Sequence, residues 1–238
     1  ALVPASRTPL YHFANYLGDR PSVTAVDESA RIIFNREDPT ANVSVMMAPL
    51  PDGRVKRLLF VDGILTASDN EDIFWNLALK GHLPILFHHD PSRVLIVGLG
   101  AGITLGAIAQ HEVEDITAIE IAKSVITVQD MFTSGNLGAH HRDNVRVIED
   151  DGRDFLVTTP HTYDVITVDQ TDPPVMMLYS KDFYEDALRV LRPDGVFLQW
   201  VPLYKMSDRT LISIIRAFDE VFPNVTVWNG KGCVFLMG

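Results

Sequence analysis

Two carboxylates, Asp169 and Asp172, follow the strand-like run at residues 163–168, and Asp172 directly precedes a Pro-Pro pair. A run of this kind predicts a buried strand, so both side chains would lie at its carboxyl end, where open α/β sheets bind ligands. Carboxylates there can hold a cationic group. An ordinary Asp, with a pKa near 3.9, is a weak base, so positioning and electrostatics would be its main contribution. The structural alternative is that Asp169 acts as a cap and Asp172 precedes a proline turn.

A glycine-rich turn supplies a second candidate site. Gly98, Gly100, Ala101 and Gly102 follow a strand-like run and open the next helical stretch. Glycines at this spacing permit a tight turn and let the backbone approach a ligand closely. Glu120 ends the second strand-like run, where a carboxylate can accept hydrogen bonds from both ribose hydroxyls. The pattern predicts a nucleoside site, and a simple connecting turn is the alternative.

The third strand-like run also ends in an acidic turn. Asp151 and Gly152 follow residues 145–148, at the same carboxyl edge of the predicted sheet. Asp151 could accept a hydrogen bond from an adenine amino group. A turn that merely starts a helix is the alternative.

The elements that must position these residues alternate between strand-like and helix-like stretches. Such alternation predicts right-handed crossovers and a mostly parallel, doubly wound sheet. The last two strand-like runs are joined by Asn229-Gly230, a strong hairpin signal, so the sheet should close on an antiparallel strand. By analogy of fold, this arrangement is a Rossmann-like, methyltransferase-type sheet of seven strands. The expected strands are residues 93–97, 115–119, 145–148, 163–168, 195–200, 224–228 and 232–236.

The first part of the chain has a different pattern. Short β-rich runs lie between residues 22 and 67, and Asp38-Pro39 and Asp52-Gly53 separate them. Because such pairs mark turns, we expect a linker and a small antiparallel β-hairpin domain over residues 1–69. The Rossmann-like catalytic domain would cover residues 70–238, which makes the fold class α/β.

Four short motifs resemble the polyamine aminopropyltransferases, the spermidine synthase family. They are Asp-x-x-Asp-Pro at residues 169–173, Leu-Tyr-Ser at 178–180, Phe-Tyr-Glu at 183–185 and Leu-Arg-Pro-Asp-Gly at 191–195. The resemblance implies transfer of an aminopropyl group from decarboxylated S-adenosylmethionine to a polyamine such as putrescine, with release of methylthioadenosine. It also implies that Asp169 orients the attacking amine and accepts its proton, that Asp172 helps to hold the cationic substrate, and that Tyr179 contacts it.

Departures from the family pattern leave the donor and the reaction open. The family has an Asp in the glycine turn that grips the donor amine, and this chain has Ala101 there. Loss of that charge removes repulsion against the carboxylate of intact S-adenosylmethionine, so either nucleoside is a plausible donor. Trp75-Asn76-Leu77 also replaces the family's Tyr-His-Glu. The alternatives are a methyltransferase that forms S-adenosylhomocysteine and a sensor domain that binds the nucleoside without turnover.

Residues 199–204, Gln-Trp-Val-Pro-Leu-Tyr, are similar to the divergent bacterial spermidine-synthase-like proteins, some of which are fused to membrane-spanning segments. Trp200 and Tyr204 could line an acceptor pocket, and core packing is the alternative. The family resemblance also implies a homo-oligomer. Because the sequence starts without Met, a longer parent chain with membrane-spanning segments is a further alternative.

Composition and charge narrow the function classes. A net charge of −11 and a pI near 5.0 argue against binding to nucleic acid, which needs clustered Lys and Arg. An acidic surface suits a cationic partner or simply aids solubility. No metal is expected, because the neighbouring histidines His88-His89 and His140-His141 would point to opposite faces of a strand.

The location is expected to be cytoplasmic. Cys233 is the single cysteine and cannot form an internal disulfide. No apolar run approaches the roughly 20 residues that span a bilayer. The chain would therefore be a cytosolic enzyme, or the cytosolic domain of a membrane-tethered protein.

Overall fold

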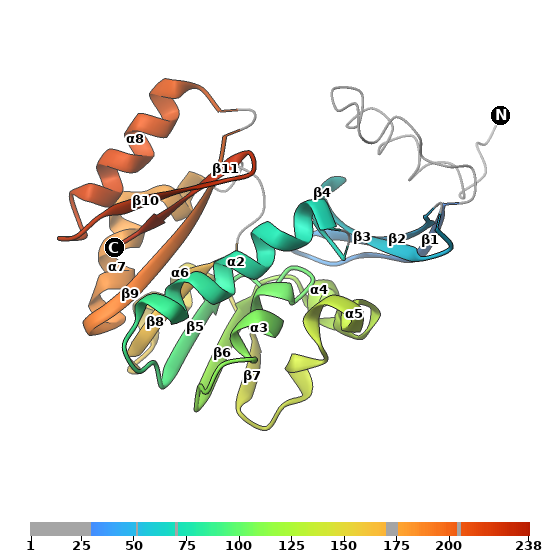
Figure 1. Cartoon of the computed structure of the whole chain (residues 1–238), viewed down its shortest axis with the longest axis horizontal. Coiled ribbons are helices and arrows are strands. Elements are labelled where there is room, and N and C mark those ends of the chain that lie inside the picture. The colour runs from blue at the N-terminus through green and yellow to red at the C-terminus, as the bar shows by residue number, and fades with distance from the viewer. Residues whose placement is uncertain (1–29, 51, 70, 170–175, 204–205) are drawn as a thin grey trace.

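The computed structural model describes residues 30–50, 52–69, 71–169, 176–203 and 206–238. It confirms an α/β architecture with a seven-stranded sheet and a separate four-stranded sheet. In Figure 1 the small sheet lies to one side of the large one, and helix α2 extends from it across the large sheet. Within these ranges, no helix is both long enough and apolar enough to cross a membrane.

The small sheet is antiparallel and its strands follow chain order. Its strands are β1 (Arg31–Glu37), β2 (Asn42–Pro49), β3 (Val55–Val61) and β4 (Ile64–Ser68). The first three match the expected runs, and β4 is an addition. It follows Asp62 and Gly63, whose φ angles of 51° and 76° are both positive. Two positive φ angles are typical of a two-residue hairpin turn, and Asp-Gly is a strong sequence signal for such a turn. The sequence therefore contained a signal for β4.

The large sheet has the order β10-β11-β9-β8-β5-β6-β7. The five neighbouring strands β9, β8, β5, β6 and β7 pair in parallel. At the other edge, β11 pairs antiparallel with β9 and β10 pairs antiparallel with β11, which confirms the predicted seven-stranded arrangement. The chain runs outward from β5 to β7 and then returns to β8 on the other side of β5. Ligands of open α/β sheets bind at such a switch point. The bounds are β5 (Arg93–Val97), β6 (Asp115–Glu120), β7 (Val145–Glu149), β8 (Tyr163–Val168), β9 (Leu191–Pro202), β10 (Thr226–Gly230) and β11 (Cys233–Met237).

Helices cover both faces of the large sheet. In β5, Val94 and Ile96 join one apolar core and Leu95 and Val97 join another, because alternate residues of a strand face opposite sides. The first core contains α2, α3 and part of the small sheet, and the second contains α6, α7 and α8. The helices are α2 (Glu71–Phe87), α3 (Ile103–Ile108), α4 (Lys123–Thr127), α5 (Thr133–Asn136), α6 (Gly152–Thr158), α7 (Lys181–Val190) and α8 (Asp208–Asp219), with 3-10 turns η1 (Gln129–Phe132), η2 (Ala139–His141) and η3 (Met176–Tyr179).

The two-domain division stays a prediction. The expected boundary at residue 69 falls between β4 and α2. However, Val43, Val45 and Leu59 of the small sheet share one core with α2 and α3. The small sheet is therefore packed against the rest of the chain rather than held by a linker alone.

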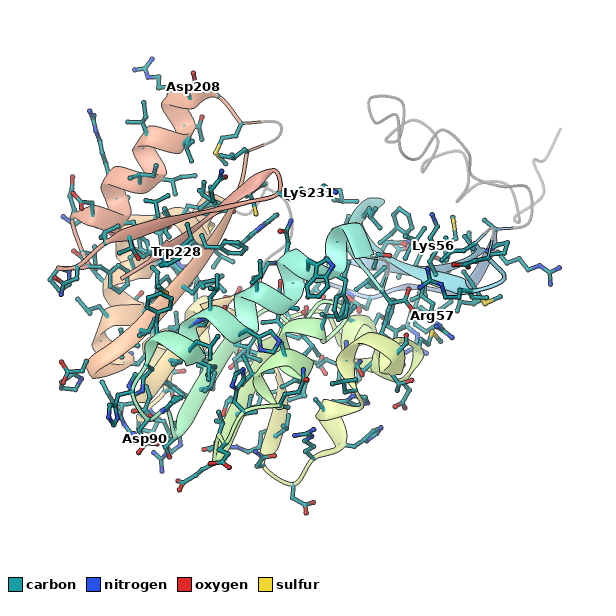
Figure 2. All side chains as sticks on the ribbon, in the orientation of Figure 1. Lys56, Arg57, Asp90, Asp208, Trp228 and Lys231 are labelled. Carbon is teal, nitrogen blue, oxygen red and sulfur yellow. The ribbon has the colours of Figure 1, made fainter. Side chains whose placement is uncertain are left out.

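The expected hairpin turn at Asn229-Gly230 is wrong by two residues. Gly230 is the last residue of β10 and pairs with Cys233, so the turn consists of Lys231 and Gly232. Gly232 has a φ of 72°, a left-handed conformation that favours glycine. Figure 2 marks Lys231 at the tip of the hairpin. Gly230 is required for packing instead, because a Cβ there would lie 2.6 Å from Sγ of Cys233.

Candidate functional site

A cavity of about 280 Å³ lies at the carboxyl ends of the central parallel strands. This volume is close to the lower end of the range typical of small-molecule sites. The small sheet contributes Thr40, Ala41 and Thr66 to its lining. The large sheet and the loops after it contribute six residues predicted from the sequence, namely Gly98, Gly100, Glu120, Asp151, Gly152 and Asp169.

The glycine turn after β5 is held from behind by side-chain amides. Its three glycines have φ angles between 54° and 90°, which only glycine adopts without strain. The amide of Gln129 donates to the carbonyl of Gly100 at 2.8 Å, and that of Asn136 donates to the carbonyl of Ala101 at 3.2 Å. Ala101 and Gly102 are thus part of the turn, although the described cavity lining includes only its first two glycines.

Glu120 ends β6 and fixes the glycine turn with its carboxylate. Oε2 accepts the N–H of Leu99 at 3.0 Å, and Oε1 accepts the N–H of Ala122 at 2.9 Å. Burial raises the pKa of Glu120, and the charge of Asp169 adds to the rise, while the backbone N–H groups oppose it. A carboxylate offers about four lone-pair sites, so Glu120 can accept further hydrogen bonds from the cavity.

Asp151 is both a cavity residue and a helix cap. Its side chain accepts the N–H of Arg153 at 2.8 Å, which caps the N-terminus of α6. The helix-start alternative is therefore correct for its local structure. Gly152 packs against β5, because a Cβ there would lie 2.5 Å from Cγ1 of Val97. A side chain at residue 152 would push the start of α6 away from the cavity.

Asp169 lies directly after β8 and is 7% exposed. Its backbone N–H donates to the carbonyl of Val97 at 2.8 Å, which extends the parallel pairing to the cavity edge. Oδ1 lies 2.5 Å from Nζ of Lys80, and Oδ2 accepts the hydroxyl of Thr104 at 2.6 Å. The carboxylate lines the cavity and is held at the same time by an internal ammonium.

Lys80 reaches Asp169 because α2 and α3 cross closely. A Cβ at Gly81 would lie 2.7 Å from both Cβ of Ala107 and the carbonyl oxygen of Thr104. Cβ atoms in proteins do not come this close to other heavy atoms, so the helices can cross here only because residue 81 is glycine. The crossing brings the lysine of α2 and the threonine of α3 to the end of β8.

A proline inside α2 ties the same turn of the helix to β8. Pro84 has no N–H to donate to the carbonyl of Lys80 four residues earlier. The hydroxyl of Thr167 on β8 donates to that carbonyl instead, at 3.0 Å. The backbone of Lys80 is therefore anchored directly over the strand that carries Asp169.

The ammonium of Lys80 also faces an aromatic ring. Nζ lies 4.4 Å from the centre of the Trp200 ring, and the two residues are 2% and 8% exposed. A cation over an indole face is attracted by the ring's electrons. Asp169 and Trp200 were both predicted to contact a cationic substrate, and in the structure both contact Lys80.

Two further predicted substrate residues, Tyr179 and Trp200, contact each other rather than the described cavity lining. The hydroxyl of Tyr179 in η3 donates to the carbonyl of Trp200 at 3.4 Å, and neither residue is among the described residues of the cavity lining. Their substrate contacts stay predictions. Asp172 and Tyr204 lie outside the described residues.

The turn between β1 and β2 is fastened beside the cavity. Oδ2 of Asp38 accepts the N–H of Ser124 at 2.9 Å, and the hydroxyl of Thr40 donates to the carbonyl of Ile121 at 3.2 Å. Burial alone would raise the pKa of Asp38, but hydrogen bonds from Ser124 and Thr40 hold it well below its usual value. The fastened turn places Thr40 and Ala41 against the cavity.

His140 and His141 do not point to opposite faces, because they lie in a 3-10 turn rather than a strand. Their Nε2 atoms lie 3.0 and 2.7 Å from Oδ1 of Asp130, a spacing that could hold a metal ion. Nδ1 of His140, however, is buried without a hydrogen-bond partner in the described part of the chain. A metal-bound histidine usually donates its other N–H. The three side chains fit a hydrogen-bonded surface cluster better.

Another histidine pair joins α2 to the loop after α3. Nδ1 of His82 lies 2.8 Å from Nε2 of His111. Burial lowers the pKa of both rings, and the neighbouring His82 lowers that of His111 further. The packing therefore favours the uncharged form of both rings.

Lys80 and Thr104 are site residues that the sequence motifs did not identify. Lys80 lies 89 positions from Asp169 in the chain, so no local spacing connects them. The available signal was a lysine inside an otherwise apolar helical stretch. A buried lysine is almost always paired, which would have predicted a carboxylate partner without naming it.

Comparison with known proteins gives a consistent family. Residues 78–229 match the model of the spermine/spermidine synthase domain. A polyamine aminopropyltransferase of Erwinia tasmaniensis is 33% identical over 176 residues, which are 72% of this chain and 61% of that protein. One from Escherichia coli is 32% identical over 173 residues, 71% of this chain and 60% of that protein. The chain thus spans about three fifths of the length of these curated relatives.

Solved structures share the fold. A spermidine synthase in complex with the transition-state analogue AdoDATO has a TM-score of 0.77 at 22% identity, covering 87% of this chain and 73% of that one. Spermidine synthase from Thermotoga maritima has 0.75 at 23% identity, covering 87% and 72%. Human methyltransferase-like protein 13 in complex with SAH has 0.54 at 25% identity, covering 68% and 78%. These likenesses confirm the predicted fold class.

Proposed function

Because this chain belongs to the spermine/spermidine synthase domain family, we propose that it transfers an aminopropyl group from decarboxylated S-adenosylmethionine to an amine. Methylthioadenosine would be the second product. Curated relatives named polyamine aminopropyltransferases support the proposal. The observation that carries it is that the glycine turn and the carboxylates of Glu120, Asp151 and Asp169 all line one cavity.

In this proposal the cavity holds the adenosyl nucleoside. Gly98 and Gly100 bring bare backbone to its lining, and Gly152 leaves the start of α6 close to β5. In this proposal Glu120 accepts the ribose hydroxyls, and Asp151 accepts the adenine amino group. Both carboxylates already accept backbone N–H groups, which fixes their orientation and leaves lone pairs for a ligand.

Two forms of the donor need testing. Ala101 stands where the family has an Asp that grips the amine of the decarboxylated donor. Without that charge, the carboxylate of intact S-adenosylmethionine meets less repulsion. Intact S-adenosylmethionine is therefore the alternative donor, and S-adenosylhomocysteine would be its methyl-transfer product.

The acceptor side centres on Asp169. When bound, the donor supplies a carbon next to a positively charged sulfur. An attacking amine must be neutral, although an ordinary alkylamine with a pKa near 10.4 carries a proton at pH 7. Asp169, fixed by Lys80 and Thr104, would orient the amine and receive its proton. Asp172 would help to hold the acceptor.

A product assay tests this proposal. The purified chain is incubated with either donor and with putrescine or spermidine, and the products are identified by mass spectrometry. We expect methylthioadenosine and an amine enlarged by one aminopropyl group, with a rate at least about 100-fold lower in Asp169→Asn because positioning and charge are both lost. Asp164→Asn is the matched control. Asp164 is 6% exposed and lies near the opposite end of the same strand, where it binds Arg192.

Two outcomes would contradict aminopropyl transfer. S-adenosylhomocysteine as the product would identify a methyltransferase. Tight binding of the nucleoside without any product would identify a sensor domain. Equal activity of Asp169→Asn and Asp164→Asn would remove Asp169 from the proposed chemistry.

A further inference from the structure

The strongest unexplained feature is an ammonium that the chain itself places at its proposed acceptor side. Nζ of Lys80 lies 2.5 Å from Asp169 and 4.4 Å from the Trp200 ring centre. The side chains of Lys80 and Asp169 are only 3% and 5% exposed. We call the space between Asp169 and Trp200 the cation position. A carboxylate and an indole face are the groups that a primary ammonium ligand would require.

The cation position is built into the fold and not the result of a flexible surface lysine. Gly81 allows the close crossing of α2 and α3, and the hydroxyl of Thr167 holds the carbonyl of Lys80. Both features fix the backbone from which the lysine extends. Because the side chain is buried, its ammonium cannot turn to solvent without opening the helix packing.

We propose that Lys80 determines acceptor specificity by filling the cation position with an internal primary ammonium. A free ammonium cannot bind between Asp169 and Trp200, because the side chain of Lys80 fills that space and its positive charge repels a second cation. The acceptor amine then approaches Asp169 from the cavity, and the second ammonium of a diamine cannot be held between Asp169 and Trp200. This inference rests on the proposed function for its assignment of Asp169 to the acceptor side.

Charge supports the same conclusion. Lys80 and Asp169 together carry no net charge, so a second ammonium gains little attraction at Asp169. Removing the lysine would leave a buried carboxylate without its partner, which is strongly unfavourable. The variant would therefore gain affinity for any small primary ammonium that fits the vacated space.

Lys80→Ala with n-propylamine is the direct test, because n-propylammonium supplies the three carbons and the nitrogen that the substitution removes. Binding is measured by calorimetry and by thermal unfolding at matched ionic strength. We expect n-propylammonium to bind Lys80→Ala at least about tenfold more tightly than the wild type and to raise only the variant's unfolding temperature. n-Propanol, which has the same size but no charge, should have no such effect. The double variant Lys80→Ala with Asp169→Asn should lose the gain.

Two results would overturn the proposal. The first is wild-type binding of n-propylammonium or putrescine that depends on Asp169 and equals binding by Lys80→Ala. The second is a folded Lys80→Ala that shows no Asp169-dependent gain. A purely structural role for Lys80 predicts the same rescue by n-propylammonium but, in the product assay, no change in the ratio of putrescine to n-propylamine turnover between Lys80→Ala and the wild type.

A wild-type measurement covers the case in which Lys80→Ala does not fold. Lysine acetylation is followed by peptide mass spectrometry, with Lys123 as the control because its side chain is 71% exposed. We expect Lys80 to react at least about tenfold more slowly than Lys123, with or without putrescine, because an ion-paired and buried amine is protected. Fast labelling of Lys80, or labelling that putrescine accelerates, would show that the cation position is open and would overturn the proposal.

The binding and labelling measurements do not require turnover. If the product assay finds no aminopropyl transfer while n-propylammonium still rescues Lys80→Ala, the proposed function fails and the cation position remains. If transfer occurs and the rescue is absent, only the assignment to Lys80 fails.

Discussion

Replacing Glu120 by Gln should lower both the free energy of unfolding and the affinity for the nucleoside, and it should lower the affinity more. Glu120 accepts the N–H groups of Leu99 and Ala122 on its two oxygens. Gln has one oxygen and one NH2 group, so one of these N–H groups would face a donor. A buried N–H without an acceptor costs about 1–3 kcal/mol.

The expected loss of unfolding free energy lies near the lower end of that range. Burial raises the pKa of Glu120, which means that burying its charge costs part of what its hydrogen bonds contribute to stability. The neutral amide avoids this cost, which offsets part of the lost hydrogen bond. We expect Glu120→Gln to lower the free energy of unfolding by about 1–2 kcal/mol, measured in urea.

Nucleoside affinity should fall more than stability does. Hydrogen bonds to a charged acceptor contribute about 1.5–3 kcal/mol, and 1.4 kcal/mol corresponds to a tenfold change. We therefore expect methylthioadenosine to bind Glu120→Gln about 10 to 100 times more weakly by calorimetry. Glu149→Gln is the matched control, because Glu149 pairs with Glu120 across β6 and β7 and its side chain is 51% exposed. Affinity of Glu120→Gln within twofold of this control would refute the ribose-binding role.

Three further predictions follow from individual contacts. Gly152→Ala should cost about 1–3 kcal/mol of stability and weaken nucleoside binding, because its Cβ would meet Val97, and adding Val97→Ala should restore part of the stability in urea unfolding. The lowered pKa values of His82 and His111 mean that the unfolded chain binds protons first, so stability should fall as pH drops below about 6.5, and His111→Gln should reduce that fall. Asp38→Asn should cost about 1 kcal/mol in thermal unfolding, because it weakens a cap on the first turn of α4, and no change would show that the β1–β2 turn is held by other contacts.

The parts of the fold that were predictable are those that depend on local sequence. The apolar runs before Gly98 and before Asp169 are short and buried on both faces, which is typical of central parallel strands. The acidic residues after them could be placed in one site, because the carboxyl ends of parallel strands share an edge. The six predicted residues that line the cavity all follow from that rule.

The parts that were not predictable depend on packing between distant elements. Lys80 meets Asp169 only because Gly81 allows α2 and α3 to approach, and no residue near Asp169 indicates this crossing. Trp200 was expected at the acceptor, but it contacts the internal ammonium. The hairpin turn was misplaced for a similar reason, because Gly230 is needed for packing against Cys233 and the turn moves to the next two residues.

The charges around the cavity bear on both substrates of the proposed reaction. The described lining carries four carboxylates, those of Asp62, Glu120, Asp151 and Asp169, and one guanidinium, that of Arg153. In the proposed function, this excess of negative charge would favour a sulfonium donor over a neutral nucleoside. Two of the carboxylates repel each other, because the charge of Asp169 raises the pKa of Glu120. Lys80 compensates Asp169 from behind, so the cavity can attract a cationic donor while the same ion pair keeps a free ammonium away from the cation position.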